Sequence, residues 1–156
     1  MKKITLFFVL LAFTVSIYAQ TKKDETDLFT STFGVQKKDV VAKFVHPTDA
    51  QKGAFWKLYD EYEAKRKEMG KTKLDLYQDY SANYATMTNE QADAWLKKVM
   101  KLQNSTDKLI SDYYTKIKTA TSSTVAVQFC QIEYYILNRI RIEIFEQIPF
   151  IPEQKN

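Results

Sequence analysis

The chain has 156 residues, of which 23 are Lys or Arg, 19 are Asp or Glu and one, His46, is histidine. The charged residues are spread along the chain without a basic tail, so the composition gives no indication of a nucleic-acid partner. The single cysteine, Cys130, excludes a disulfide within one chain. Its two interpretations are a small buried side chain and an intermolecular disulfide.

The first nineteen residues have the features of a secretory signal peptide. Lys2 and Lys3 form a charged start, the apolar stretch from Ile4 to Ile17 follows, and Ala19 precedes an acceptable cleavage site. The apolar stretch is only about two-thirds of the roughly 20 residues that a membrane-spanning helix needs. We therefore expect a periplasmic protein whose mature form, residues 20–156, has no integral membrane segment.

The mature chain is expected to form one all-α domain. It contains three Gly and three Pro, and this scarcity of turn residues beside long runs of helix formers favours helices over strands. We assign residues 1–19 to the signal peptide, 20–34 to a flexible lead-in, 35–152 to a single helical domain and 153–156 to a tail. The first helix is short and predicted over about 35–45, because Pro47 follows its end.

The pattern T-x-x-Q occurs twice, as Thr48/Gln51 and Thr88/Gln91. In a capping box, the Thr side chain accepts from the backbone N–H three residues later, and the Gln side chain there reaches back to the Thr N–H. Each pair therefore predicts the start of a helix directly after its threonine. The role of the motif is structural rather than catalytic.

Two long amphipathic helices follow these boxes. They are predicted over 49 to about 85 and over 89 to about 118, and the short connection between them makes an antiparallel hairpin. At about 100° per residue, the apolar side chains of the first helix fall within an arc of about 100°, the width of one buried stripe. The stripe consists of Phe55, Leu58, Tyr59, Tyr62, Met69, Leu76, Tyr77, Tyr80, Tyr84 and Met87.

A loop is predicted over residues 119–125, with Ser122 or Ser123 as the cap of a last helix that runs to about 148. The apolar residues of this last helix point nearly all round its axis, a pattern typical of a helix that is buried on more than one side. A single elongated chain of this size is not expected to cover all of that surface. A homodimer or a binding groove would account for the rest.

Beyond the helix caps, the motifs resemble those of a known family. The segments "PTDAQ" (47–51) and "MTNEQ" (87–91), with flanks such as "AFWKLYDEYE", resemble the Spy/CpxP family of periplasmic proteins, which carry two L-T-x-x-Q motifs. Pro47 and Met87 stand where the family has Leu, and the resemblance covers about 35–152. It implies an elongated helical hairpin with additional N- and C-terminal helices, paired into a cradle-shaped dimer. It also implies a role in envelope stress.

Two functional hypotheses follow from this resemblance. In the first, the protein is an ATP-independent chaperone that holds unfolded clients on a helical dimer surface, to which Arg66 and Lys73 contribute cations. In the second, it is an accessory regulatory module that binds one specific envelope partner. Cations within an apolar stripe are also compatible with pairing inside a helix interface. The candidate client-binding residues are Phe55, Tyr59, Tyr62, Arg66, Met69 and Lys73.

The sequence carries no pattern typical of an enzyme. Acid–base catalysis most often uses His, and His46 is the only one, while the carboxylates are expected mainly on solvated helix faces. His, Cys and carboxylates do not cluster in the way that metal sites require, although some members of the Spy/CpxP family bind zinc or other metals. We therefore expect no catalytic residue, no cofactor and no metal site.

Overall fold

The computed structural model describes residues 29–30 and 34–152, so the expected signal peptide, most of the lead-in and the tail lie outside the described residues. Within them the chain is all-α. The elements are α2 (Lys37–Phe44), α3 (Asp49–Asn83), the 3-10 helix η1 (Tyr84–Thr86), α4 (Asn89–Ala120) and α5 (Ser123–Gln147). So far as the chain is described, none of these helices combines the length and apolar character needed to cross a membrane.

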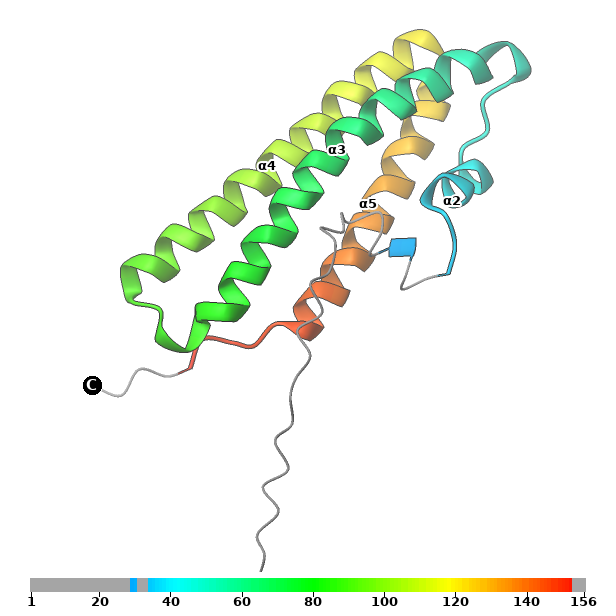
Figure 1. Ribbon diagram of the computed structural model, residues 1–156. Helices are drawn as coiled ribbons and strands as arrows, with labels where there is room; N and C mark the ends of the chain where they lie inside the picture. The colour runs from blue at the N-terminus through cyan, green and yellow to red at the C-terminus, as the bar shows by residue number, and fades with distance from the viewer. Residues whose placement is uncertain (1–28, 31–33, 153–156) are drawn as a thin grey trace, which may run out of the picture.

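The helices α3 and α4 form the predicted antiparallel hairpin, and α5 runs back along it (Figure 1). The 35 residues of α3 correspond to a length of about 52 Å at about 1.5 Å per residue. α4 packs against both α3 and α5, while α2 packs against α5 near the end where α3 begins (Figure 1). The result is an elongated three-helix bundle with a short helix on its side.

Both predicted capping boxes stand at helix starts. In the second box the Thr88 N–H donates to Gln91 Oε1 at 2.9 Å, and the Gln91 N–H donates to Thr88 Oγ1 at 3.3 Å. In the first, the Thr48 N–H donates to Gln51 Oε1 at 3.1 Å, and Gln51 Nε2 donates to the carbonyl of Thr121 at 3.0 Å. Gln51 therefore caps α3 and also connects its start to the end of α4.

The connection between α4 and α5 is shorter than predicted. Instead of a loop over 119–125, only Thr121 and Ser122 separate the two helices. The Ser122 hydroxyl accepts from the N–H of Val125 at 3.3 Å and caps α5, as predicted for one of two candidate serines. The Thr121 hydroxyl donates to the carbonyl of Ile117 at 2.6 Å. These two side chains satisfy backbone groups at the adjoining helix ends, which permits the tight connection.

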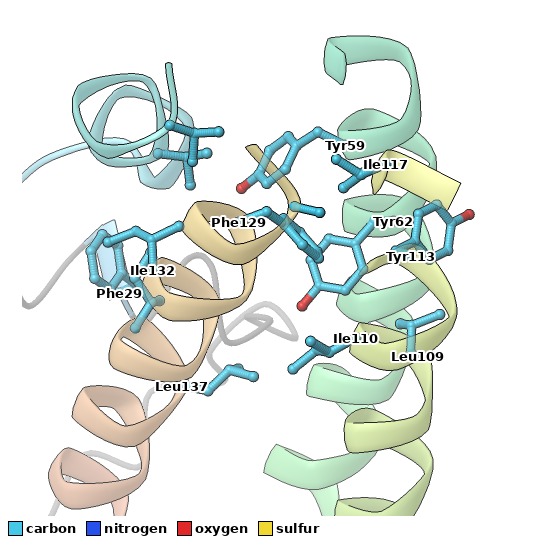
Figure 2. Close-up of a cluster of buried hydrophobic side chains, with 14 of the residues drawn as sticks. Phe29, Tyr59, Tyr62, Leu109, Ile110, Tyr113, Ile117, Phe129, Ile132 and Leu137 are labelled. Atoms are coloured by element: carbon cyan, nitrogen blue, oxygen red, sulfur yellow. The ribbon is translucent and has the colours of Figure 1, made fainter. Parts of the chain in front are cut away.

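The core lies where α3, α4 and α5 meet and is rich in aromatic rings (Figure 2). Tyr62 of α3 packs edge-to-face against Phe129 of α5, with centroids 5.0 Å apart, and against Tyr113 of α4, at 5.5 Å. Such pairs contribute about 0.5–1.5 kcal/mol each beyond the area that they bury. The predicted stripe of α3 is confirmed: Phe55, Tyr59, Tyr62, Tyr77 and Tyr80 are buried, and Leu58, Met69, Leu76, Tyr84 and Met87 are partly buried.

The other end of the hairpin is fixed by Trp95 and Tyr80. Their rings stack with centroids 4.3 Å apart, and Trp95 Nε1 donates to the carbonyl of Leu76 at 3.0 Å. The Tyr80 hydroxyl donates to the carbonyl of Pro149 at 2.7 Å. The segment that follows α5 is thereby attached to α3 near the hairpin turn (Figure 1).

Replacing Thr88 with Ala removes the side-chain acceptor at the start of α4. We expect the free energy of unfolding to fall by about 1 kcal/mol, and the Tm by about 2–4 °C for a chain of this size. Thermal unfolding followed by circular dichroism measures both. Thr88→Ser keeps the hydroxyl and is the matched control. Equal losses in the two variants would contradict the capping role.

Candidate functional site

The six candidate client-binding residues all lie on the inward side of α3: Phe55, Tyr59, Tyr62, Arg66, Met69 and Lys73. Phe55, Tyr62 and Arg66 are 0% exposed and Tyr59 is 1% exposed, whereas Met69 and Lys73 are partly buried. In this arrangement the four buried side chains contact other parts of the same chain and offer no surface to another protein. Arg66 is paired inside a helix interface, which was the alternative interpretation of a cation within the apolar stripe.

A buried ionic cluster, formed by Lys37, Glu63, Arg66 and Glu133, joins α2, α3 and α5. Lys37 Nζ lies 2.6 Å from Glu63 Oε2 and 2.8 Å from Glu133 Oε2. Arg66 Nε lies 3.3 Å from Glu63 Oε2. The side chains of Arg66 and Glu133 are fully buried and that of Lys37 is 2% exposed. Two positive and two negative charges are thus balanced inside the protein.

Two tyrosines of α3 complete the surroundings of Glu133. The Tyr62 hydroxyl donates to Glu133 Oε2 at 2.7 Å, and the Tyr59 hydroxyl lies 3.5 Å from Glu133 Oε1. Burial first, and the Glu133 carboxylate second, raise the pKa of both tyrosines, so their hydroxyls stay protonated and act as donors. The Lys37 ammonium lies 5.8 and 5.5 Å from the two ring centroids, within cation–π distance.

The chemistry of the ionic cluster indicates that it docks α2 on the bundle. α2 has only eight residues, and Lys37 in its first turn reaches α3 and α5 at once, beside the buried Val41 and Val45. A helix this short is marginal without tertiary contacts. Lys37, Glu63 and Glu133 were not among the site residues that we predicted from the sequence. The available signal was Glu133, a single carboxylate within the otherwise aliphatic and aromatic run "IEYYIL".

The outward side of α5 carries a row of large apolar side chains, which we name the α5 outer face: Val127, Tyr134, Tyr135, Ile142 and Phe145. Their exposed fractions range from 44% to 61%. At about 100° per residue, the five positions fall within an arc of about 100° opposite the buried side of the helix. α5 therefore presents apolar side chains both to the core and away from it, as its sequence pattern predicts.

A shallow hollow of about 200 Å³ continues this face toward α2, and Phe44, Gln128, Gln131, Ile132 and Tyr135 line it. Phe44 is 56% exposed, so the apolar surface extends from α5 onto the neighbouring helix. Gln128 Oε1 accepts from the His46 N–H at 3.0 Å and holds the segment that follows α2. The surface thus combines exposed aromatic rings with side-chain amides.

A second concave feature, the α3–α4–α5 groove, lies farther along the bundle. It has a volume of about 310 Å³, and residues of all three helices line it, including Lys73, Tyr77, Met100, Gln103, Arg141 and Phe145. Of the candidate client-binding residues, only Lys73 is among those that line this groove. Phe145 belongs to both the groove and the α5 outer face.

Cys130 and the carboxylates are the remaining candidates for chemistry. Burial first, and Glu133 second, raise the pKa of the partly buried Cys130 thiol to about 11. The thiol is therefore protonated near neutral pH, whereas the thiolate is the reactive form. In the described ranges, no group of three or more His, Cys, Asp or Glu side chains is placed to hold a metal ion.

No protein-family model, curated protein or solved structure matches the chain. The Spy/CpxP resemblance therefore rests on the sequence motifs alone. Of these motifs, the two T-x-x-Q boxes have a complete physical explanation as helix caps.

Replacing Glu133 with Gln leaves the buried Lys37 ammonium without one of its two carboxylates. We expect the free energy of unfolding to fall by about 3–5 kcal/mol, the usual cost of breaking a buried ion pair from one side. Urea unfolding followed by circular dichroism measures the loss. The double variant Lys37→Met/Glu133→Gln removes both charges, keeps an acceptor for the Tyr62 hydroxyl and is expected to regain part of the stability. A double variant less stable than Glu133→Gln would contradict the assigned pairing.

The raised pKa of Cys130 predicts a thiol that reacts slowly at neutral pH. Its alkylation by iodoacetamide should accelerate about tenfold per pH unit and continue to rise beyond pH 10, because the thiolate fraction grows until the pKa is reached. Mass spectrometry of timed samples gives the rate. A short unstructured peptide with one cysteine, whose thiol has the ordinary pKa of about 8.5, is the control and should level off earlier. A plateau of the protein rate by pH 9 would contradict the prediction.

Proposed function

We propose that this protein is a non-enzymatic, ATP-independent chaperone-like protein of the bacterial envelope stress response, and that the α5 outer face holds segments of unfolded proteins. The periplasmic location follows from the signal-peptide pattern of residues 1–19. The role in envelope stress follows from the Spy/CpxP resemblance. The observation that carries the holding function is the exposed apolar face of α5.

The composition of this face supports adaptable rather than specific binding. Tyr134, Tyr135 and Phe145 present rings, Ile142 and Val127 present branched aliphatic groups, and all five are 44–61% exposed. Large apolar side chains gathered on one exposed helix face of a folded protein indicate an interaction site. Tyrosine has an apolar ring and a polar tip, so it contacts many different side chains at low conformational cost.

Two polar features of α5 add to this adaptability. Arg139 lies next to the α5 outer face, 3.7 Å from Glu143 in a partly exposed pair. Exposed pairs of this kind are weak, at about 0–1 kcal/mol, so they rearrange at little cost when a client approaches. Gln131 and Asn138, both exposed, supply amide groups for the backbone of an extended client.

A homodimer is part of this proposal, because a second copy would cover apolar surface that one chain leaves exposed. Twofold dimers are the commonest protein oligomers. If two copies meet through the α5 outer face itself, clients must use another surface. The oligomeric state therefore has to be measured together with the holding activity.

The accessory regulatory module remains the second proposal. It predicts a defined complex with one envelope protein and little protection of unrelated clients. The same α5 outer face would then be the surface that recognises that partner.

Replacing Tyr135 and Ile142 together with Ser should weaken holding several-fold, since two of the five large side chains of the α5 outer face lose their apolar surface. The measurement is light scattering from a chemically denatured client, diluted into residues 20–156 of the protein without nucleotide. Leu96→Ser is the matched control, because Leu96 is 49% exposed on α4, outside this face. Circular dichroism should show both variants folded.

The mass of each variant, measured by multi-angle light scattering, distinguishes the outcomes. Loss of holding at unchanged mass supports clients on the α5 outer face. A fall in mass with holding retained identifies the face as a dimer contact. Absence of holding by the unsubstituted protein at any ratio contradicts the chaperone proposal.

A further inference from the structure

The α3–α4–α5 groove differs in character from the α5 outer face because it is concave and carries charge. Its apolar walls include Tyr77 of α3, Val99 and Met100 of α4, and Phe145 of α5. Tyr77 and Phe145 pack edge-to-face with centroids 5.9 Å apart, so the groove has a firm aromatic wall. Its volume of about 310 Å³ is at the small end of the range, roughly 300–1,000 Å³, of pockets that hold small molecules.

The charges along the groove have one sign. Lys73 and Arg141 line it from opposite helices, and no acidic residue is found among its described lining residues. Arg141 Nη2 donates to Gln103 Oε1 at 2.5 Å. In this hydrogen bond the acceptor for the guanidinium is a neutral amide. Gln103 Nε2 in turn donates to Asp107 Oδ2 at 3.1 Å, which fixes the orientation of the amide.

We infer that the α3–α4–α5 groove binds an amphipathic monoanion, a carboxylate on an unbranched aliphatic chain. The guanidinium of Arg141 presents several N–H donors in a planar fork that matches a carboxylate, and one of them is engaged by Gln103. Lys73 supplies a second positive charge in the groove. The aliphatic chain lies against Tyr77, Val99, Met100 and Phe145, where it leaves water.

This site takes a different class of ligand from the one proposed for the α5 outer face. A polypeptide needs an open surface, whereas a volume of this size suits a single chain with one charged end. Phe145 is the one residue that both sites share. The two activities can therefore be separated by variants at residues that only one of them uses.

The test titrates the protein with monomeric decanoate, followed by calorimetry and by the NMR signals of the Gln103 and Asn104 side-chain amides, which line the groove. Decanoate is expected to bind at one site per chain and to shift both amide signals. Propionate, which has the same head group on a short chain, should bind at least about tenfold more weakly, because each buried methylene contributes about 0.8 kcal/mol. Decyltrimethylammonium, with the same chain and opposite charge, should not compete.

Two substitutions locate the site. Arg141→Gln should weaken decanoate binding about tenfold or more, the loss expected for a charge-assisted hydrogen bond. Met100→Glu places a repelling carboxylate in the groove at a side chain that is 57% exposed, so folding should be unaffected while binding is lost. Met100→Gln removes the same apolar contact without adding a charge and should weaken binding less than Met100→Glu. Lys52→Gln, at an exposed pair at the start of α3, is the control and should bind normally.

Several results would overturn the inference. Equal affinity for decanoate and decyltrimethylammonium would mean that the cations have no part in binding. Unchanged affinity in both Arg141→Gln and Met100→Glu would place the ligand elsewhere. Binding to vesicles of phosphatidylglycerol without binding to monomeric decanoate would indicate a membrane surface as the partner. The chaperone proposal is tested independently, with the variant Tyr135→Ser/Ile142→Ser, and none of these results decides it.

Discussion

The arrangement of the helices depends on the neutralisation of one buried carboxylate, Glu133. A charge with no exposed surface must be paired and hydrogen-bonded, or the folded state pays its full desolvation cost. Glu133 receives the Lys37 ammonium from α2 and the Tyr62 hydroxyl from α3. These contacts fix the position of α2 and the rotation of α3 about its axis relative to α5. Apolar packing alone specifies such a rotation less sharply, because it is not directional.

This constraint also decides which surfaces remain for function. With α2 docked, Tyr59, Tyr62 and Arg66 are enclosed, and the apolar stripe of α3 becomes core rather than a binding surface. The exposed apolar side chains are concentrated on α5 and in the segment after it. α5 therefore has two apolar sides with different roles. One side completes the core, and the other is available to a client, a partner or a second copy.

Much of the fold follows from local sequence rules, whereas the buried charges do not. Thr48, Gln51, Thr88 and Gln91 predict the starts of α3 and α4, because capping depends on residues three apart in sequence. The α3 stripe is predictable from helical periodicity for the same reason. The burial of Lys37 depends on Glu63 and Glu133, which are 26 and 96 residues away in sequence. No local pattern identifies which lysine of an exposed-looking segment reaches such a pair.

The candidate sites differ in predictability for the same physical reason. The apolar residues of α5 can be read from the sequence, but which of them face outward depends on where α2, α3 and α4 contact the helix. The α3–α4–α5 groove exists only after Lys73 and Arg141, 68 residues apart in the numbering, are brought to its two sides. If a second copy occupies the α5 outer face, it competes with clients by mass action, and holding then depends on protein concentration. The groove lies between helices of one chain, so a ligand bound there would be independent of that competition unless Phe145 is itself covered.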